Sequence, residues 1–420
     1  MFCFVHAADI HLDSPMHKLE AYDGAPVEEF RLSTRRALEN VVDLALCEKA
    51  NFVLISGDLY DGDWKDYNTG LYFINQMMRL GKAGIQVFVV AGNHDAASTI
   101  TRSLRMPDNV TLFAANRAET KTMEDPPVAI HGRSFATPAE KKDLSADYPD
   151  PVAGRFNIGM LHTCATGRSG HEPYAPCTPA RLEQAGYQYW ALGHVHEHEI
   201  LCKNPFVVFP GNTQGRHIRE AGPKGCALVN VTDSGEIHLA FKPTDVVRWS
   251  LISVDASGSR DPREVVSAFA DQLETLISQN NAMPLAVRVE ITGETRSAGE
   301  LAADPDRWTG EIRAAAMETG MGRVWVEKVR FFCRLPADID HPPSGGAMEE
   351  LVSLFEDLAE DPEAREELAG ELSDFCRKLP GELKQSPDGI QCNDPDWIKA
   401  LLEQVRPELV GRLMRKGERS

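Results

Sequence analysis

Five short polar motifs, each placed directly after a run of apolar residues, constrain the fold of this chain more than any other feature. They are Asp9-Ile-His11, Gly57-Asp58, Gly92-Asn93-His94-Asp95, His162 and Gly193-His194-Val195-His196. The preceding runs are short and mostly rich in β-branched or aromatic residues, which is typical of buried strands. Polar side chains at successive strand ends predict that the motifs meet at one edge of a sheet.

Strand-like and helix-like segments alternate through the first 245 residues. Apolar runs predict strands at 2–8, 52–56, 85–90, 156–161, 187–192, 206–209, 226–231 and 237–241. Amphipathic patterns predict helices at 27–49 and 67–82. The expected fold class is therefore α/β, with a two-sheet β-sandwich flanked by helices, and residues 1–245 are expected to form one domain.

The predicted secondary structure changes twice after residue 245. Residues 246–334 predict a small α+β domain, with strands at 249–254, 285–291 and 323–332 and helices at 262–279 and 298–319. Residues 335–346 contain three prolines and two glycines, which is typical of a linker. Residues 347–420 predict a helical C-terminal region, with helices at 347–368 and 394–415.

Composition argues against several classes of protein. The 420 residues contain no apolar run long enough to span a bilayer and no signal-peptide pattern, so no membrane and a cytoplasmic location are expected. Nine cysteines without a CxxC pair indicate reduced thiols. The net charge of −19 does not favour direct nucleic-acid binding, although bound cations and a basic partner could supply the positive charge.

The first two motifs offer carboxylates and an imidazole at strand ends. Asp9 and His11 stand two residues apart, so in extended geometry both project to the same side and could hold one cation. The glycine before Asp58 allows a tight turn at the sheet edge, where this carboxylate could bridge two metals. Either motif by itself is better explained as an ordinary turn.

The third motif is the most specific of the five. The Asn93 amide oxygen could ligate a hard metal, and His94 could donate a proton or a hydrogen bond. Asp95 could fix the tautomer of that histidine. Two other carboxylates are ambiguous: Asp61 could orient a metal ligand, but solvated turn residues explain Asp61 and Asp63 equally well.

Three more imidazoles follow later strands, at His162, His194 and His196. Neutral histidine nitrogens bind metals at working pH, and the H-x-H pair repeats the spacing of the first motif. The other histidines have no partner pattern and are interpreted as structural or surface residues: His6, His17, His131, His171, His198, His238 and His341. The mixture of oxygen and nitrogen ligands predicts two divalent metal ions, with Mn²⁺ preferred and iron or Zn²⁺ as alternatives.

The order of these motifs resembles that of the calcineurin-like metallophosphoesterase superfamily. The resemblance implies one metal at Asp9, His11, Asp58 and His196, and a second at Asp58, Asn93, His162 and His194. It also implies that the two cations activate a water for in-line attack on phosphorus and stabilise charge on the phosphate. His94, oriented by Asp95, would then protonate the departing oxygen.

Two segments resemble the YhaO-like branch of the SbcD-type DNA repair nucleases: His11-Leu12-Asp13-Ser14-Pro15 and Pro210-Gly-Asn-Thr-Gln-Gly-Arg-His-Ile-Arg-Glu220. This resemblance implies a DNA exonuclease or endonuclease in which residues 246–334 cap the site and face DNA. The partners that it implies are DNA, an SbcC-like coiled-coil ATPase docked by the C-terminal helices, and a second copy of the chain. Arg216, His217 and Arg219 could hold the nucleotide backbone or form a structural turn.

Three alternatives stay open beside the nuclease. A cyclic-nucleotide or small-molecule phosphodiesterase or phosphatase would share the same motifs. A phosphoprotein phosphatase is disfavoured, because that branch usually carries GDxVDRG where this chain has Gly57-Asp-Leu-Tyr-Asp-Gly-Asp63. A non-catalytic metal-binding scaffold is disfavoured because every ligand position is filled.

Overall fold

The computed structural model describes residues 1–14, 27–61, 67–97, 105–165, 174–336, 347–379, 390–391 and 394–417. The chain divides into two compact units. The first comprises Met1–Ser250 with Met283–Ala286, and the second comprises Leu251–Ala282 with Val287–Ser420. All residues of the candidate site belong to the first unit.

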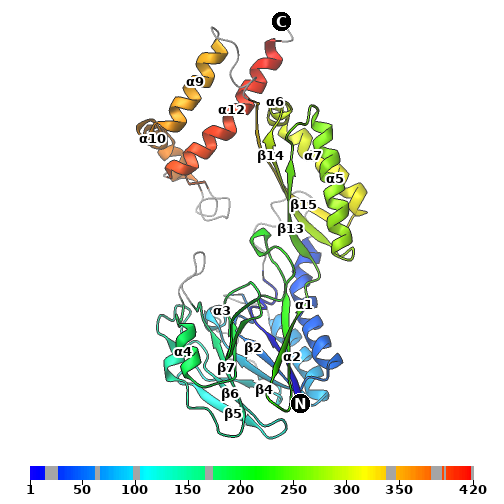
Figure 1. Ribbon diagram of the computed structural model, residues 1–420, viewed down its shortest axis with the longest axis vertical. Helices are drawn as coiled ribbons and strands as arrows, with labels where there is room; N and C mark the ends of the chain where they lie inside the picture. The colour runs from blue at the N-terminus through cyan, green and yellow to red at the C-terminus, as the bar shows by residue number, and fades with distance from the viewer. Residues whose placement is uncertain are drawn as a thin grey trace. The chain divides into compact units, whose positions relative to one another are not determined.

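Two six-stranded sheets form the centre of the first unit (Figure 1). The first sheet has the strand order β12 (Ile237–Pro243), β11 (Gly225–Val231), β1 (Phe2–Ala7), β2 (Phe52–Ser56), β3 (Gln86–Val90) and β4 (Val110–Leu112). The second has the order β5 (Glu119–Met123), β6 (Val128–Gly132), β7 (Phe156–His162), β8 (Tyr189–Gly193), β10 (Phe206–Phe209) and β9 (Glu199–Lys203). The expectation of a two-sheet α/β fold is confirmed.

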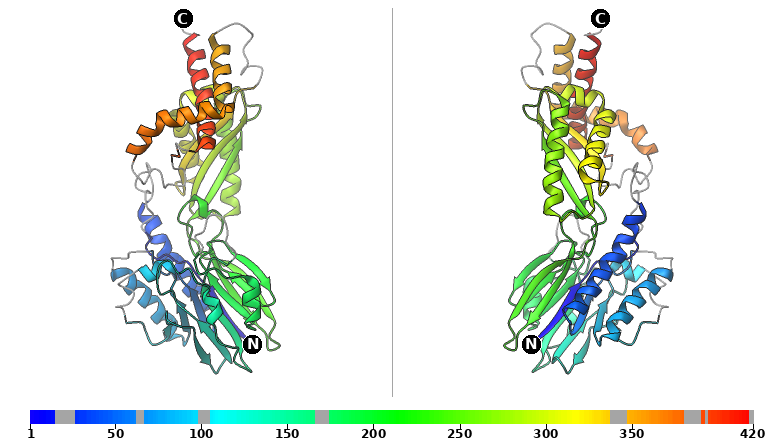
Figure 2. Two further views of the ribbon diagram at one scale, coloured as in Figure 1. Left: turned by 90° about the vertical axis from the view of Figure 1, so that its left-hand side faces the viewer. Right: turned by 90° about the vertical axis from the view of Figure 1, so that its right-hand side faces the viewer.

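Apolar side chains fill the space between the sheets and cover their outer faces. Between the sheets lies a cluster of large buried side chains, among them Phe4, Phe52, Phe88, Ile158 and Tyr189. α1 (Val27–Cys47) and α2 (Tyr67–Lys82) pack outside the first sheet, and α4 (Pro179–Gln184) packs outside the second (Figure 2). This layering gives the strand ends a rigid base.

Parallel strand pairs decide where the motifs lie. β1, β2 and β3 are parallel neighbours in the first sheet, and β6, β7 and β8 are parallel neighbours in the second. The carboxyl ends of parallel neighbours emerge at the same edge of a sheet. The motif residues lie at or just after the carboxyl ends of β1, β2, β3, β7 and β8, so both sheets contribute to one site.

A small three-stranded sheet is built mainly from the second unit. Its order is β13 (Arg248–Asp255), β14 (Leu285–Glu294) and β15 (Val324–Arg334). α5 (Pro262–Gln279) packs beside α7 (Pro305–Gly320), which lies against β15 (Figure 1). The expected β-α-β-α-β order is present apart from one interrupted helix.

That interruption corrects the single helix expected at 298–319. The structure has α6 (Ala298–Ala303) and then α7, with Asp304 between them. The Asp304 side chain accepts a hydrogen bond from the amide of Arg307 and so caps α7. The next residue is a proline, which has no amide hydrogen to continue α6 but fits the first turn of α7.

The helix expected at 347–368 is interrupted for the same reason. It consists of α9 (Ala347–Glu360) and α10 (Pro362–Lys378). Asp361 accepts a hydrogen bond from the amide of Glu363, and the proline that follows Asp361 begins α10. An Asp-Pro pair therefore ends one helix and starts the next at both places.

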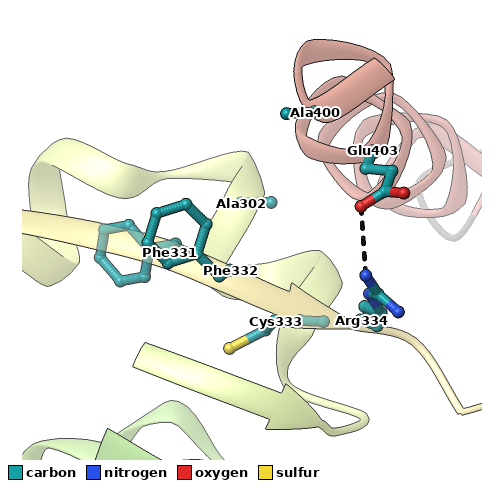
Figure 3. A pocket seen from close by; sticks show the side chains of 8 residues that line it. Ala302, Phe331, Phe332, Cys333, Arg334, Ala400 and Glu403 are labelled. Atoms are coloured by element: carbon teal, nitrogen blue, oxygen red, sulfur yellow. Dashed lines mark hydrogen bonds and ion pairs between the residues drawn. The ribbon is translucent and has the colours of Figure 1, made fainter. Parts of the chain in front are cut away.

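The last helix, α12 (Pro395–Gly417), packs against α6 and contacts β15 within the second unit. A small pocket of about 150 Å³ lies at this contact. Arg334 Nη2 lies 3.1 Å from Glu403 Oε2 there (Figure 3). The pocket is lined by Ala298, Ala302, Phe331, Phe332, Cys333, Arg334, Ala400 and Glu403. The helical C-terminal region is therefore packed on the α+β module. Residues 337–346 of the expected linker lie outside the described part of the chain.

Two expectations from composition can be compared with the structure. None of the helices in the described ranges has the length and apolarity needed to cross a bilayer. Seven cysteines are free thiols: Cys3, Cys47, Cys164, Cys177, Cys202, Cys226 and Cys333. Cys376 in α10 is disulfide-bonded, so the expectation of reduced thiols is wrong for this residue. Residue spacing carries no CxxC signal that could have indicated this bond.

A buried ion pair joins β14 and β15. Arg288 Nε and Nη2 lie 2.8 and 2.7 Å from the two carboxylate oxygens of Glu327, and their side chains are 8% and 4% exposed. Replacing Glu327 by Ala would remove the carboxylate that accepts two hydrogen bonds from a buried guanidinium. We expect Glu327→Ala to lower the free energy of unfolding of the second unit by about 3–5 kcal/mol. Thermal unfolding followed by tryptophan fluorescence measures this loss.

A second pair on the same strands provides the control. Arg330 Nη1 lies 3.5 Å from Glu290 Oε1, and both side chains are about one quarter exposed. Glu290→Ala should cost less than about 1 kcal/mol because solvent screens such pairs. Equal losses for Glu327→Ala and Glu290→Ala would contradict the assigned role of burial.

Candidate metal centre

The seven predicted ligands come together at the carboxyl ends of the strands. Asp9, His11 and His196 form one group, and Asp58, His162 and His194 form another, with the ligand atoms of each group within 4.8 Å of one another. Asp58 also lies between the groups, because its Oδ2 is 3.9 Å from Nε2 of His11 and 3.4 Å from Nε2 of His162. The Asn93 amide oxygen lies 3.0 Å from Nε2 of His162 and completes the second group.

The backbone at the site lies in the left-handed region at several non-glycine residues. The φ angles are 50° at Asp9, 45° at His11, 50° at Asp58 and 102° at His194. Such angles are uncommon for non-glycine residues, although Asp and His tolerate them better than most, and they concentrate at functional sites. The interpretation of Asp9-Ile-His11 as extended chain is therefore wrong. Both side chains reach one group because the backbone turns after β1.

Hydrogen bonds fix the tautomers of two ligand histidines. Nδ1 of His162 lies 3.0 Å from the carbonyl oxygen of Ser56, and Nδ1 of His196 lies 2.7 Å from Oε1 of Glu220. Both contacts require a proton on Nδ1, which leaves the Nε2 lone pair available for a cation. Neutral imidazoles in this tautomer are suitable metal ligands.

The remaining donors also fit a cation. Asp9 accepts the backbone amide of His194 at 3.0 and 2.9 Å, which holds its carboxylate in place. Nε2 of His11 is buried and has no hydrogen-bond partner among the described residues. A buried polar atom is normally paired, so this nitrogen indicates a position for a positively charged partner. The donor set of carboxylates, an amide and imidazoles fits divalent metal ions.

Two glycines are required because ligands lie against them. A Cβ atom at Gly57, where φ is 94°, would lie 2.3 Å from Nδ1 of His162. A Cβ atom at Gly92 would lie 2.3 Å from Oδ1 of Asp58. Any larger residue would therefore displace a ligand of the second group, which explains the glycine in each motif.

Asp58 and His162 form an ion pair when no metal ion is bound. Burial by itself would lower the pKa of His162, but the Asp58 charge and hydrogen bond raise it to about 9. Burial and the charge of Arg216 lower the pKa of His11 to about 4. His11 is therefore neutral at pH 7, whereas a cation must displace a proton from His162. Metal affinity should rise with pH for that reason.

Asp95 does not hold His94 as the sequence suggested. Its carboxylate accepts the backbone amides of Gly92, Leu59 and Tyr60 at 3.0, 3.2 and 3.0 Å, which ties the third motif to the second. The carboxylate beside His94 is Asp61, whose Oδ1 lies 3.0 Å from Nδ1 of His94. The proposed tautomer role of Asp95 is corrected accordingly. Of the two ambiguous carboxylates, Asp61 orients a histidine, and Asp63 lies outside the described residues.

Comparison with known proteins agrees with this geometry. A family model described as calcineurin-like phosphoesterase matches residues 3–198, and a model of the middle domain of metallophosphoesterase YhaO matches residues 249–334. A Bacillus subtilis protein named as an uncharacterised metallophosphoesterase, YhaO, is 34% identical over 294 residues, covering 69% of this chain and 71% of the relative. The chain belongs to the YhaO family of calcineurin-like metallophosphoesterases. The resemblance inferred from the motifs is confirmed.

More distant relatives of this YhaO-family chain carry the name DNA double-strand break repair protein Mre11. The protein of that name from Thermoplasma acidophilum is 21% identical over 305 residues, covering 69% of this chain and 77% of the relative. The one from Sulfurisphaera tokodaii is 24% identical over 279 residues, covering 61% and 66%.

Arg216 is held inside the site of this YhaO-family chain by acidic neighbours. Its side chain is 13% exposed, its Nη2 lies 2.9 Å from Oε1 of Glu220, and its Nη1 lies 3.6 Å from Oδ2 of Asp61. These contacts favour the structural alternative for Arg216 over a direct grip on a nucleotide backbone. His217 is about half exposed and Arg219 is exposed, and their substrate contacts stay a prediction.

Glu220 is a site residue that motif reasoning missed. It is buried and accepts hydrogen bonds from His196, from the Asn212 amide at 3.0 Å and from the backbone of Arg216 at 2.8 Å. Burial would raise the pKa of Glu220, but Arg216 and His196 lower it well below its usual value. The carboxylate is therefore charged at working pH. The signal available was its place at the end of the segment 210–220, next to an arginine and a histidine.

We expect Glu220→Gln to weaken Mn²⁺ binding by about 10- to 100-fold, because the charge that polarises His196 is lost. Competition titration with a chelating indicator measures the affinity. Glu236→Gln removes an exposed carboxylate at a loop and should leave the affinity unchanged. Equal affinities of Glu220→Gln and the unaltered protein would show that Glu220 does not support the ligand.

Proposed function

We propose that this chain hydrolyses DNA phosphodiester bonds as a repair nuclease, acting as an exonuclease or endonuclease with two Mn²⁺ ions. One observation supports it above all: Asp58 lies between two groups of ligand atoms, and His94 lies within ligand reach of His11 and Asp58. This arrangement suits a phosphate held between two cations with a proton donor at its leaving oxygen. The coarser statement, that the protein is a metallophosphoesterase, follows from its family.

The residues take the following roles in this proposal. Asp9, His11, Asp58 and His196 would hold one cation, and Asp58, Asn93, His162 and His194 would hold the other. Two divalent cations, when bound, lower the pKa of water and stabilise the charge on the phosphate. Asp61 holds Nδ1 of His94, which leaves Nε2 as the nitrogen that can give a proton to the leaving oxygen.

DNA as substrate is supported by the names of the more distant relatives, which are DNA double-strand break repair proteins. We also propose that residues 246–334 form a capping domain that faces the substrate. One observation favours a second candidate, a small or cyclic-nucleotide phosphodiesterase. Residues 249–334 contain ten Lys and Arg against thirteen Asp and Glu, which is not the balance of a typical DNA-binding surface.

A substrate panel tests the proposal. The protein loaded with Mn²⁺ is given linear duplex DNA, single-stranded DNA, a cyclic nucleotide, bis(p-nitrophenyl) phosphate and a phosphopeptide. The proposal expects cleavage of at least one DNA and of bis(p-nitrophenyl) phosphate. Turnover of the cyclic nucleotide or the phosphopeptide without any cleavage of DNA would overturn it. Zn²⁺ and Fe²⁺ in parallel reactions test the preference for Mn²⁺.

We further propose that α9 and α10 dock an SbcC-like coiled-coil ATPase and that the chain works with a second copy of itself. The support is two large apolar side chains, Leu354 and Phe375, which are 52% and 55% exposed on these helices. Leu354→Asp with Phe375→Asp should abolish co-purification with that ATPase. Retention of the partner by this double variant would refute the docking surface, and the mass in solution tests the dimer.

A further inference from the structure

The two oxygens of the Asp61 carboxylate have different partners. Oδ1 lies 3.0 Å from Nδ1 of His94 and 3.5 Å from Nδ1 of His11. Oδ2 accepts a hydrogen bond of 2.6 Å from the hydroxyl of Ser14 and lies 3.6 Å from Nη1 of Arg216. Oδ1 therefore faces the histidines of the site, and Oδ2 is held by Ser14 and lies near Arg216.

Ser14 is itself firmly placed. It is 5% exposed, and its backbone amide donates to the carbonyl oxygen of His11 at 3.0 Å. The residue before it, Asp13, accepts two hydrogen bonds from the guanidinium of Arg35 in α1 and one from the hydroxyl of Thr69 in α2. The hydroxyl of Ser14 thus reaches Asp61 from a loop that two helices hold in position.

Removal of the Ser14 hydroxyl would delete the hydrogen bond to Oδ2 of Asp61, the carboxylate that orients His94. Asp61 is 19% exposed, so water can replace the lost hydrogen bond only in part. Without Ser14, the remaining contact of Oδ2 is Arg216 Nη1 at 3.6 Å, which is longer than a hydrogen bond. The carboxylate can then rotate about its side-chain torsions, and Oδ1 is held less closely to Nδ1 of His94. Turnover is sensitive to displacements of about 1 Å in the groups that take part in the reaction.

We propose that Ser14 is a positioning residue for leaving-group protonation, acting through Asp61 on His94. This inference rests on the proposed phosphodiester hydrolysis. In that reaction the oxygen of water forms a bond to phosphorus, and the bond from phosphorus to the leaving oxygen breaks with its electron pair remaining on that oxygen. The leaving oxygen takes the proton from Nε2 of His94, and the proton released by the water replaces it.

The substrates for the test differ in their need for that proton. Linear DNA has an alkoxide leaving group that must be protonated, whereas bis(p-nitrophenyl) phosphate releases a phenolate that is stable without a proton. We expect Ser14→Ala to lower kcat on DNA by about 10- to 100-fold, with KM and bound Mn²⁺ unchanged. Its kcat on bis(p-nitrophenyl) phosphate should equal that of the unaltered protein. Ser14→Thr keeps a hydroxyl and should recover most of the lost turnover.

Ser33→Ala is the matched control. Ser33 is also buried, and its hydroxyl also makes one hydrogen bond of 2.6 Å, but to the carbonyl oxygen of Phe30 within α1. This variant should match the unaltered protein on both substrates. A general effect of deleting a buried hydroxyl would instead appear in both variants.

A measurement independent of turnover completes the test. The proton on Nδ1 of His94 can be followed by NMR and assigned by its absence in His94→Gln. We expect its resonance to move in Ser14→Ala and not in Ser33→Ala. An unmoved resonance, an equal loss on both substrates, or a loss of Mn²⁺ would each overturn the proposal. If the unaltered protein cleaves bis(p-nitrophenyl) phosphate but no DNA, the nuclease proposal fails, and the resonance still decides the role of Ser14.

Discussion

Asp58→Asn is expected to remove both metal ions and to lower phosphodiester hydrolysis by on the order of 10³-fold or more. Asp58 is the carboxylate between the two ligand groups, with Oδ2 3.9 Å from Nε2 of His11 and 3.4 Å from Nε2 of His162. Asparagine has nearly the same shape, but it lacks the charge and offers only one oxygen. Metal content by plasma mass spectrometry and turnover of bis(p-nitrophenyl) phosphate measure the two effects.

A surface variant separates this effect from a general loss of carboxylate. Asp108→Asn changes an exposed residue before β4 and should retain two metal ions and full turnover. The bridging role of Asp58 is wrong if Asp58→Asn retains both ions and near-normal turnover. Loss of one ion only would place Asp58 in a single group.

In the proposed nuclease reaction, His94→Gln is expected to lower turnover of DNA by about 10²- to 10⁴-fold while both metal ions stay bound. Nδ1 of His94 lies 3.0 Å from Oδ1 of Asp61. Nε2 is therefore the nitrogen that can donate a proton to the leaving oxygen. Burial would lower the pKa of His94, but the hydrogen bond to Asp61 and nearby negative charge raise it overall. The protonated imidazole therefore persists to higher pH than usual.

The sign of the pH dependence follows from that shift. The proton donor is active below the pKa of His94, so kcat on DNA should fall as the pH rises through that value. His94→Gln should lack this fall, because no donor remains to be lost. Metal content is the decisive control, since His94 also lies within ligand reach of His11 and Asp58. Loss of a metal in His94→Gln would make His94 a ligand instead of a proton donor.

The residues of the candidate site can be predicted from the sequence. Each motif follows an apolar run, and runs such as 52–56 and 206–209 have the bounds of β2 and β10. The period of the apolar residues and the order of the motifs are local properties, so they can be read along the chain. The sequence pattern does not predict the three-residue β4, the polar edge strand β5 or the edge strand β9. It also does not predict the buried β6, in which only Val128, Ala129 and Ile130 form an apolar run. Both helix interruptions were missed although each has an Asp-Pro pair.

The contacts that orient the candidate ligands become visible only in the folded protein. Asp95 stands next to His94 in sequence, yet it binds backbone amides, and Asp61 from the loop after β2 takes the place beside that histidine. Glu220 holds His196 from 24 residues away. These contacts depend on which strands are neighbours in space. His94 and Asp95 are consecutive residues of the short helix α3 (Asn93–Ala97), and consecutive helix positions direct their side chains apart. The ligands follow from local pattern, whereas the groups that orient them follow from packing.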